Sequence, residues 1–336
     1  MTTGTTGRQW AANNLFQAKD GGGGDGAPPP SDPAVWLAGL RLGEAQDLAP
    51  YQIHPLCLEE AGPAPQMLLT HQAIEAQVLE IIEEGEGDVQ ALTARNNGGQ
   101  PVVVLEGDTL VGCKQNRVVA RSVILGKGAS VTIPVGCMER GRWAWKTGQF
   151  GSGTMRMSPT MRSGTTREIL EAKKRRHQHA SLNQSRLWDD VDAHMSAERV
   201  ASPSADFHAL IDEKGRDARE RAAAFQRQPG QVGVLVMAGG TFLGLELAGH
   251  PATWDELAGR TLPAFLLDRR WAAERGKGAS ERPLRASDWL TRLQQTPLNT
   301  TPGLGLGREV DVELDGLGGS GLWHEEQMVH MAVFAC

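Results

Sequence analysis

The residues best suited to binding a ligand are four polar side chains that follow one another directly, Lys114, Gln115, Asn116 and Arg117. Their amide and cationic groups donate hydrogen bonds that suit phosphate or carboxylate oxygens, with arginine acting as a bidentate fork and lysine as a point charge. The alternative is a structural role, in which Arg117 pairs with Glu106 or Asp108 and the amides bond to the backbone. We favour ligand binding for this block.

Two carboxylates precede the block in a predicted turn. Glu106 and Asp108 lie between residues 102–105 and 109–111, whose apolar runs predict the two strands of a hairpin. Carboxylates so placed could act as general acid and base, or could hold Mg²⁺ through oxygen. The alternative is that Asp108 only caps its own turn, as aspartate after glycine often does. Catalysis by this pair is therefore one expectation, and a purely structural role is the alternative.

A cysteine further along the chain is a candidate nucleophile. Cys137 is followed closely by Arg140 and Arg142, and nearby positive charge lowers the pKa of a thiol. Glu139, two residues after the cysteine, is a further candidate for proton transfer. The alternative is a buried structural cysteine, the more usual environment of this residue type.

Two tryptophans follow the cysteine at alternating positions. Trp143 and Trp145 could stack an adenine ring, although aromatic side chains more often cover the edge of a core. We predict that Arg142 and Trp143 join the 114–117 block in binding one ligand, so that both parts of the sequence face the same cavity.

Composition and charge limit the classes of function. The chain has 336 residues, 40% hydrophobic and 22% charged, with a net charge of −6. Such a charge gives no global attraction to nucleic acid, so only the basic run at residues 173–176 offers that weaker alternative. The four cysteines are far apart and predict neither a disulfide framework nor a zinc site, so no metal ligand is assigned. No apolar run is long enough to span a bilayer, and no leader pattern is recognised, so the expected location is cytoplasmic.

The order of predicted elements indicates an α+β fold. Residues 1–34 are rich in Gly and Pro and predict a disordered tail, and residues 35–336 predict a single domain. Short strands joined by tight turns favour antiparallel sheets in a sandwich-like core. A helical segment is inserted at about 160–228, and C-terminal strands at about 305–336 complete the sheets. Residues 147–166, rich in Gly, Ser, Thr and Met, predict a mobile loop, and residues 253–256 form a capping box that predicts a helix start.

Two blocks of sequence resemble a known family. These are residues 106–119, which contain the Lys-Gln-Asn-Arg run, and residues 133–143, which contain Cys-x-Glu-x-Gly-Arg-Trp. They resemble the bacterial domain family named for its association with ADP-ribosylglycohydrolases and the rhodanese-phosphatase superfamily. The resemblance covers roughly residues 40–267. Cys113, where a small residue such as alanine is expected, and a longer insertion at 155–161 depart from the family pattern.

The resemblance implies a link to ADP-ribose or NAD metabolism and an association with ADP-ribosylglycohydrolase or phosphatase proteins. It supplies no catalytic residue, and the cofactor stays unknown. Combined with the residues above, it predicts a domain that binds or processes an ADP-ribose-like or otherwise phosphorylated small molecule. The alternative is a noncatalytic binding or assembly module, whose polar block organises the fold or a partner surface.

Overall fold

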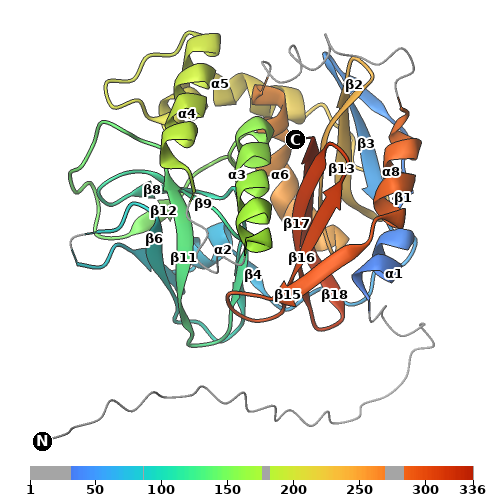
Figure 1. Cartoon of the computed structure of the whole chain (residues 1–336), viewed down its shortest axis with the longest axis horizontal. Coiled ribbons are helices and arrows are strands. Elements are labelled where there is room, and N and C mark those ends of the chain that lie inside the picture. The colour runs from blue at the N-terminus through green and yellow to red at the C-terminus, as the bar shows by residue number, and fades with distance from the viewer. Residues whose placement is uncertain (1–31, 86, 176–181, 269–283, 336) are drawn as a thin grey trace, which may run out of the picture.

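The computed structural model describes residues 32–85, 87–175, 182–268 and 284–335. Its largest element is a nine-stranded antiparallel sheet whose strands run in the order β1-β3-β13-β14-β18-β17-β16-β15, with β2 paired to β3 (Figure 1). The strands are β1 (Arg41–Leu42), β2 (Gln46–Leu48), β3 (Tyr51–Cys57), β13 (Gln231–Ala238), β14 (Thr241–Ala248), β15 (Leu298–Pro302), β16 (Arg308–Leu314), β17 (Leu317–His324) and β18 (Gln327–Ala335). The sheet thus combines strands from near the start, the middle and the end of the described chain.

Two smaller sheets lie beside it. One has six strands in the order β12-β8-β9-β11-β6-β5, and the other has three, in the order β10-β7-β4, with β4 parallel to β7. Their strands are β4 (Leu68–Leu69), β5 (Leu79–Ile82), β6 (Ala91–Asn96), β7 (Val102–Val104), β8 (Thr109–Gly112), β9 (Arg117–Val119), β10 (Val123–Leu125), β11 (Ser130–Cys137) and β12 (Phe150–Ser152). The predicted hairpin of β7 with β8 is wrong, because β7 pairs with β10 while β8 pairs with β9 and β12.

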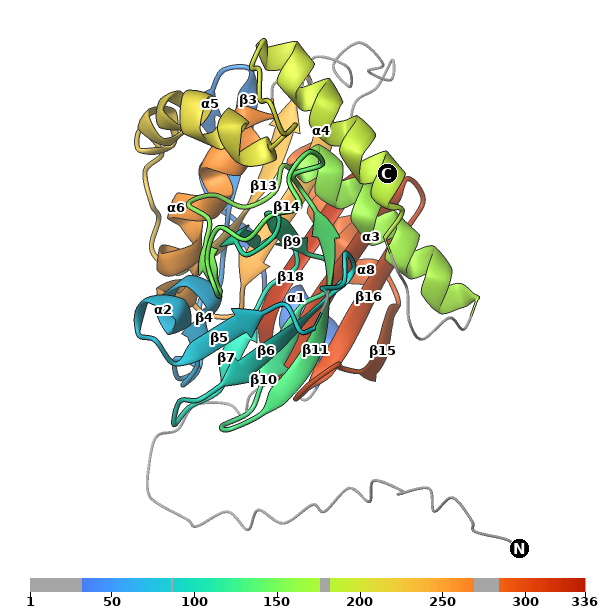
Figure 2. The same cartoon turned by 90° about the vertical axis from the view of Figure 1, so that its left-hand side faces the viewer.

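Helices cover the sheets and fill the space between them. They are α1 (Pro33–Ala38), α2 (Thr70–Glu75), α3 (Pro159–Lys174), α4 (Gln184–Glu198), α5 (Phe207–Ala222), α6 (Pro251–Leu267) and α8 (Ala286–Gln295). Helix α3 packs on β17 and β18 and stands between the large and the small sheets (Figure 1). Figure 2 shows α4 running beside α3, to which Arg186 and Glu168 join it by an ion pair at 2.5 Å. The predicted helical insertion at 160–228 therefore corresponds to α3, α4 and α5.

The start of α6 differs from its prediction. The helix begins at Pro251, and the ring of His250 accepts the backbone N–H of Ala252 as the cap. Thr253, expected to cap the helix, lies inside its first turn, and Pro263 is accommodated within the helix. Proline suits a first helical position because its fixed φ matches the helix and its missing N–H would have had no partner. The helix was thus predicted correctly, and its boundary was not.

The Met-rich stretch before α3 is part of the core. Met155, Met157 and Met161 have no exposed surface, and Phe150 begins strand β12 near the start of the predicted loop. The expectation of a mobile loop over residues 147–166 is therefore wrong. Methionine is flexible and fills irregular gaps between packed elements, which fits a segment wedged between sheets.

The antiparallel sheets and the helices together confirm the α+β prediction. Of the predicted tail, residues 1–31 lie outside the described residues, whereas Pro33 is buried at the start of α1. The division into a tail and one domain stays a prediction. Among the described helices, none has the length and apolar character needed to cross a bilayer.

Candidate ligand-binding site

Residues 113–116 form the turn between β8 and β9, and Arg117, the last member of the 114–117 block, begins β9. Two residues with positive φ, Gly112 at 132° and Cys113 at 42°, reverse the chain just before this block. A side chain at Gly112 would meet Thr147, whose Oγ1 would lie 2.3 Å from a Cβ atom there. Asn116 then fastens the turn, since its Oδ1 accepts the N–H of Gly112 at 3.0 Å and its Nδ2 donates to Asp206 at 2.9 Å.

The second sequence block packs directly against this turn. The N–H of Asn116 donates to Glu139 at 3.2 Å, and Arg142 pairs with the same carboxylate at 2.6 Å. Arg142 also donates to the carbonyl oxygen of Cys113 at 2.6 Å, and the hydroxyl of Ser204 donates to Glu139 at 2.9 Å. The structure therefore brings the two blocks into contact, with Glu139 and Arg142 holding the turn in place.

Arg117 is the most deeply buried member of the block. Its side chain has no exposed surface and pairs at 3.1 Å with Glu83, which is equally buried. It also donates to Gln115 at 3.1 Å. The alternative drawn from the sequence, in which Arg117 pairs with Glu106 or Asp108, is thus wrong about the partner, which is Glu83. Glu83 could have been found from its spacing, because it continues the alternation of buried Leu79 and Ile81 along β5.

Cys137 lies on β11, opposite Arg117 in the strand register. It is fully buried, and its thiol contacts the carbonyl oxygen of Glu139 at 3.0 Å and Gln115 Oε1 at 3.2 Å. Burial raises the pKa of the thiol, although the positive charge of Arg117 acts in the opposite direction. The environment is therefore that of a protonated, sheltered cysteine. Its proposed nucleophilic role stays a prediction that needs a chemical test.

We expect iodoacetamide to label Cys137 no faster than Cys57 in native protein near neutral pH. The thiolate is the reactive form, and burial raises the pKa of both thiols, but Cys137 is completely buried whereas Cys57 is partly exposed. Mass spectrometry of timed digests measures both rates, and unfolded protein gives the reference in which both thiols are accessible. Preferential labelling of Cys137 in the native state would restore it as a nucleophile.

An exposed aromatic surface adjoins the turn. Trp143 and Trp145 are 51% and 54% exposed, and the ammonium group of Lys114 lies 5.1 and 5.2 Å from their ring centroids. Both distances fall within the range of cation–π attraction. Lys114 is itself only 9% exposed, and Lys146, the residue after Trp145, is exposed. We call Lys114, Trp143, Trp145 and Lys146 the tryptophan surface.

Of the predicted ligand set, Lys114 and Trp143 belong to the tryptophan surface, and Arg142 is partly exposed beside the turn. Gln115, Asn116 and Arg117 are at most 5% exposed, and their partners lie within the protein. These three residues shape the turn, and Trp143 projects from the fold beside it. Trp145, whose stacking role the sequence suggested only in passing, and Lys146, which sequence reasoning missed, complete the surface.

Glu106 and Asp108 lie in a different environment from the turn. Arg162 pairs with Glu106 at 2.8 Å and with Glu246 at 2.5 Å. Arg156 pairs with Glu246 and approaches Asp108 at 3.4 Å. All these side chains are at most 7% exposed. We call this group the buried ionic network; it joins α3 and the segment before it to the large and the small sheets.

Two further residues complete the network. His330 contacts Glu246 at 2.8 Å, and burial lowers the pKa of its imidazole. The arginines hold the pKa of Glu246 far below its usual range despite the opposing effect of burial. Gly107 allows the close approach, because a Cβ atom there would lie 2.6 Å from Nε of Arg162. Sequence reasoning did not find Arg156, Arg162 or Glu246.

The basic run that suggested nucleic-acid binding is largely engaged within the protein. Lys173 pairs with Glu309 at 2.6 Å and with Asp311 at 2.5 Å, and Lys174 pairs with Glu313. Arg176, at the end of the run, lies outside the described residues. Within the described ranges, no cluster of three or more His, Cys, Asp or Glu side chains is arranged to hold a metal ion.

Comparison with known proteins gives one match. The sequence model of the ARG and Rhodanese-Phosphatase-superfamily-associated Protein domain matches residues 39–334. No curated protein and no solved structure matches the chain. The match extends beyond the predicted range of 40–267 and includes the C-terminal strands. It therefore spans both the tryptophan surface and the buried ionic network.

Proposed function

Because this chain belongs to the family of ARG and Rhodanese-Phosphatase-superfamily-associated Protein domains, we propose that it binds an ADP-ribose-like, phosphorylated small molecule at the tryptophan surface. The observation that carries the proposal is the pair of half-exposed indoles around one ammonium group. A ring system and cations at one place suit a ligand that has a base at one end and phosphate at the other.

Each part of the surface has a physical role in this proposal. A nucleobase stacks on the exposed parts of Trp143 and Trp145, which contributes about 1 to 3 kcal/mol per stacked base. Lys146 neutralises phosphate charge from solvent, and Lys114 adds positive potential from beneath the rings. Arg142 and Glu139 fix the backbone on which the tryptophans are carried.

The contacts of the candidate catalytic groups support binding rather than turnover. Glu106 and Glu139 are each paired with an arginine at 2.8 Å or less, and Asp108 accepts from Thr70 and from the N–H of Leu105. All three carboxylates are buried and are engaged by partners within the protein, so none is presented to a ligand at the tryptophan surface. We therefore favour the noncatalytic alternative: the domain presents or retains its ligand in the cytoplasm, in association with ADP-ribosylglycohydrolase or phosphatase proteins.

The proposal predicts a defined ligand preference. ADP-ribose and ADP should bind more tightly than adenosine, which lacks phosphate, and more tightly than ribose 5-phosphate, which lacks the base. Trp143→Ala should weaken ADP-ribose binding roughly tenfold, as expected for one lost stacking contact. Lys146→Gln should weaken ADP-ribose but leave adenosine unchanged. Isothermal titration calorimetry measures all four ligands.

Two matched variants serve as controls. Val35→Ala removes another exposed apolar side chain, and Lys127→Gln removes another exposed lysine; neither residue belongs to the tryptophan surface. Neither should alter binding. If none of the four ligands binds, or if Trp143→Ala binds ADP-ribose as the unmodified protein does, the proposed function is wrong. If the unmodified protein binds a partner protein but none of the four ligands, and Trp143→Ala no longer binds that partner, the result would favour an assembly module.

A further inference from the structure

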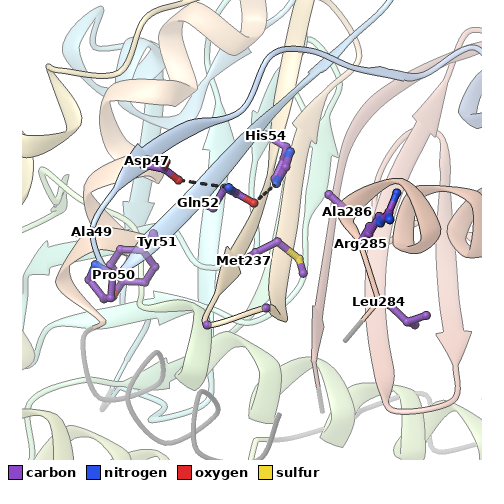
Figure 3. Close-up of a pocket in the computed structure, with 12 residues that line it drawn as sticks. Asp47, Ala49, Pro50, Tyr51, Gln52, His54, Met237, Leu284, Arg285 and Ala286 are labelled. Atoms are coloured by element: carbon purple, nitrogen blue, oxygen red, sulfur yellow. Dashed lines mark hydrogen bonds between the residues drawn. The ribbon is translucent and has the colours of Figure 1, made fainter. Parts of the chain in front are cut away.

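A cavity lies on the nine-stranded sheet, and its lining residues are far in sequence from the tryptophan surface. Its volume is about 640 Å³, within the range of small-molecule sites, which is roughly 300 to 1,000 Å³. Its walls come from the β2–β3 hairpin, the turn between β13 and β14, and the start of α8 (Figure 3). None of these elements carries a residue of the ligand site predicted from sequence.

The strand register places three of the lining side chains on one face of the sheet. Gln52 pairs with Met237 across β3 and β13, so both point to the same side, and His54 follows two residues later on that side. Figure 3 shows these three side chains between the hairpin and α8. Pro50 and Leu284 add apolar surface at the rim. The cavity therefore has an apolar wall and a polar wall.

The polar wall has a defined direction of hydrogen bonding. Gln52 Nε2 donates to Asp47 at 3.2 Å, so the amide oxygen of Gln52 faces His54 Nε2 at 3.0 Å. Burial lowers the pKa of His54, with Asp47 acting in the opposite direction, so the ring is neutral at pH 7. A neutral ring whose Nε2–H donates to Gln52 carries no proton on Nδ1. Nδ1 of His54 is then a hydrogen-bond acceptor.

The remaining sides of the cavity carry two charged residues and a turn of two glycines. Arg285 lines it from the residue before α8 and is exposed. Asp47, which also lines the cavity, keeps its negative charge while it accepts the amide of Gln52, so the two charges mark different ends of the cavity and the Arg285 end suits an anionic group. Gly239 and Gly240 form the turn with φ of 55° and 78°, and they contribute no side chain to fill the space.

We propose that this cavity binds a small aromatic carboxylate whose ring lies on Met237, whose carboxylate pairs with Arg285 and whose polar hydrogen is donated to His54. The ring matches the apolar wall, the carboxylate matches the cation, and the donor matches the unprotonated Nδ1. This site is independent of the proposed function at the tryptophan surface, since the two share no residue. A phenolic hydroxyl on the side of the ring opposite the carboxylate is the simplest such donor.

The test uses four closely related probes and calorimetric titration of the full chain. They are 4-hydroxyphenylacetate, phenylacetate, which lacks the donor, 4-hydroxyphenylacetamide, which lacks the charge, and tyramine, which reverses it. We expect 4-hydroxyphenylacetate to bind with a dissociation constant of about a millimolar or tighter, given its size. The other three should bind at least fivefold more weakly.

Variants assign each contact. Arg285→Gln should reduce the affinity for 4-hydroxyphenylacetate to that for its amide, whereas Arg292→Gln, which changes an exposed arginine within α8, should not. His54→Phe should remove the difference between 4-hydroxyphenylacetate and phenylacetate. Met237→Trp should fill the cavity and abolish binding. Because Met237 is buried, a melting curve must accompany that variant, and the exposed Arg285 gives the deciding result if it fails to fold.

Two outcomes would overturn the proposal. One is binding of 4-hydroxyphenylacetate no tighter than that of tyramine. The other is binding that Arg285→Gln and His54→Phe both leave unchanged, since the probe would then occupy another place. Trp143→Ala separates the two sites: it should leave this binding intact even where it abolishes binding of ADP-ribose.

Discussion

Arg162→Met should destabilise the protein by about 3 to 5 kcal/mol, the usual effect of removing one partner from a buried ion pair. Arg162 is 1% exposed and contacts both Glu106 and Glu246. Methionine keeps much of the volume but leaves two carboxylates without their shared cation. Urea unfolding followed by circular dichroism measures the loss. Arg175→Met, at the exposed end of the same helix, is the matched control and should change stability by less than about 0.5 kcal/mol.

The same network predicts how stability depends on pH. The arginines depress the pKa of Glu246 in the folded state. Its contribution to stability is therefore complete above the ordinary glutamate pKa of about 4.3 and is lost as the pH falls toward the depressed value. Unfolding free energies measured at a series of pH values should fall across that acid range. If Arg162→Met instead unfolds like the unmodified protein, the arginine does not hold the network together.

The contrast between the two carboxylate groups shows what position along the chain cannot reveal. Glu106 and Asp108 are close in sequence to the 114–117 block, yet their arginine partners, Arg156 and Arg162, come from the start of α3 and the segment before it. Ion pairs depend on which elements pack together. The sequence showed the two acids without their partners, so catalysis was a reasonable expectation. The structure shows that both acids contact buried arginines, which gives them a structural role.

Local patterns predicted individual elements better than their pairing. Residues 102–105 and 109–111 are strand-like, as expected, but alternation of apolar side chains does not state which strand is the neighbour. For residues 147–166, the predicted element itself was wrong. Their Gly, Ser and Thr content favours a loop, whereas the burial of Met155 and Met157 is decided by the sheets on either side.

The candidate site was accessible to sequence reasoning in part. The sequence predicted that the 114–117 block and the block around Glu139 face one cavity; in the structure the two blocks touch, since the N–H of Asn116 donates to Glu139, and the shared cavity stays a prediction. What the residues could not show is which polar groups remain exposed. Arg117 and Trp143 were both assigned to the ligand, yet one is wholly buried and the other half-exposed. The spacing of Glu83 after Leu79 and Ile81 indicates that it is buried, but its pairing with Arg117 depends on how the strands pack, which spacing does not supply.

The last prediction therefore concerns Arg117, which separates a ligand-binding role from a structural one. Arg117→Met should destabilise the protein by about 3 to 5 kcal/mol, because Glu83 would be left buried without its cation. The double variant Glu83→Gln, Arg117→Met should recover much of this loss, since it removes both charges. Thermal and urea unfolding measure the three variants, including Glu83→Gln alone.

Ligand titration of the same proteins completes the argument. If Arg117 supports the turn, ADP-ribose affinity should return together with stability in the double variant, because the tryptophan surface is intact once the turn folds. If Arg117 itself contacts the phosphate, the double variant should be stable yet still fail to bind, because the guanidinium is missing. A stable Arg117→Met that loses ligand would likewise assign the arginine to binding. The complete burial of both charged partners leads us to expect the first result.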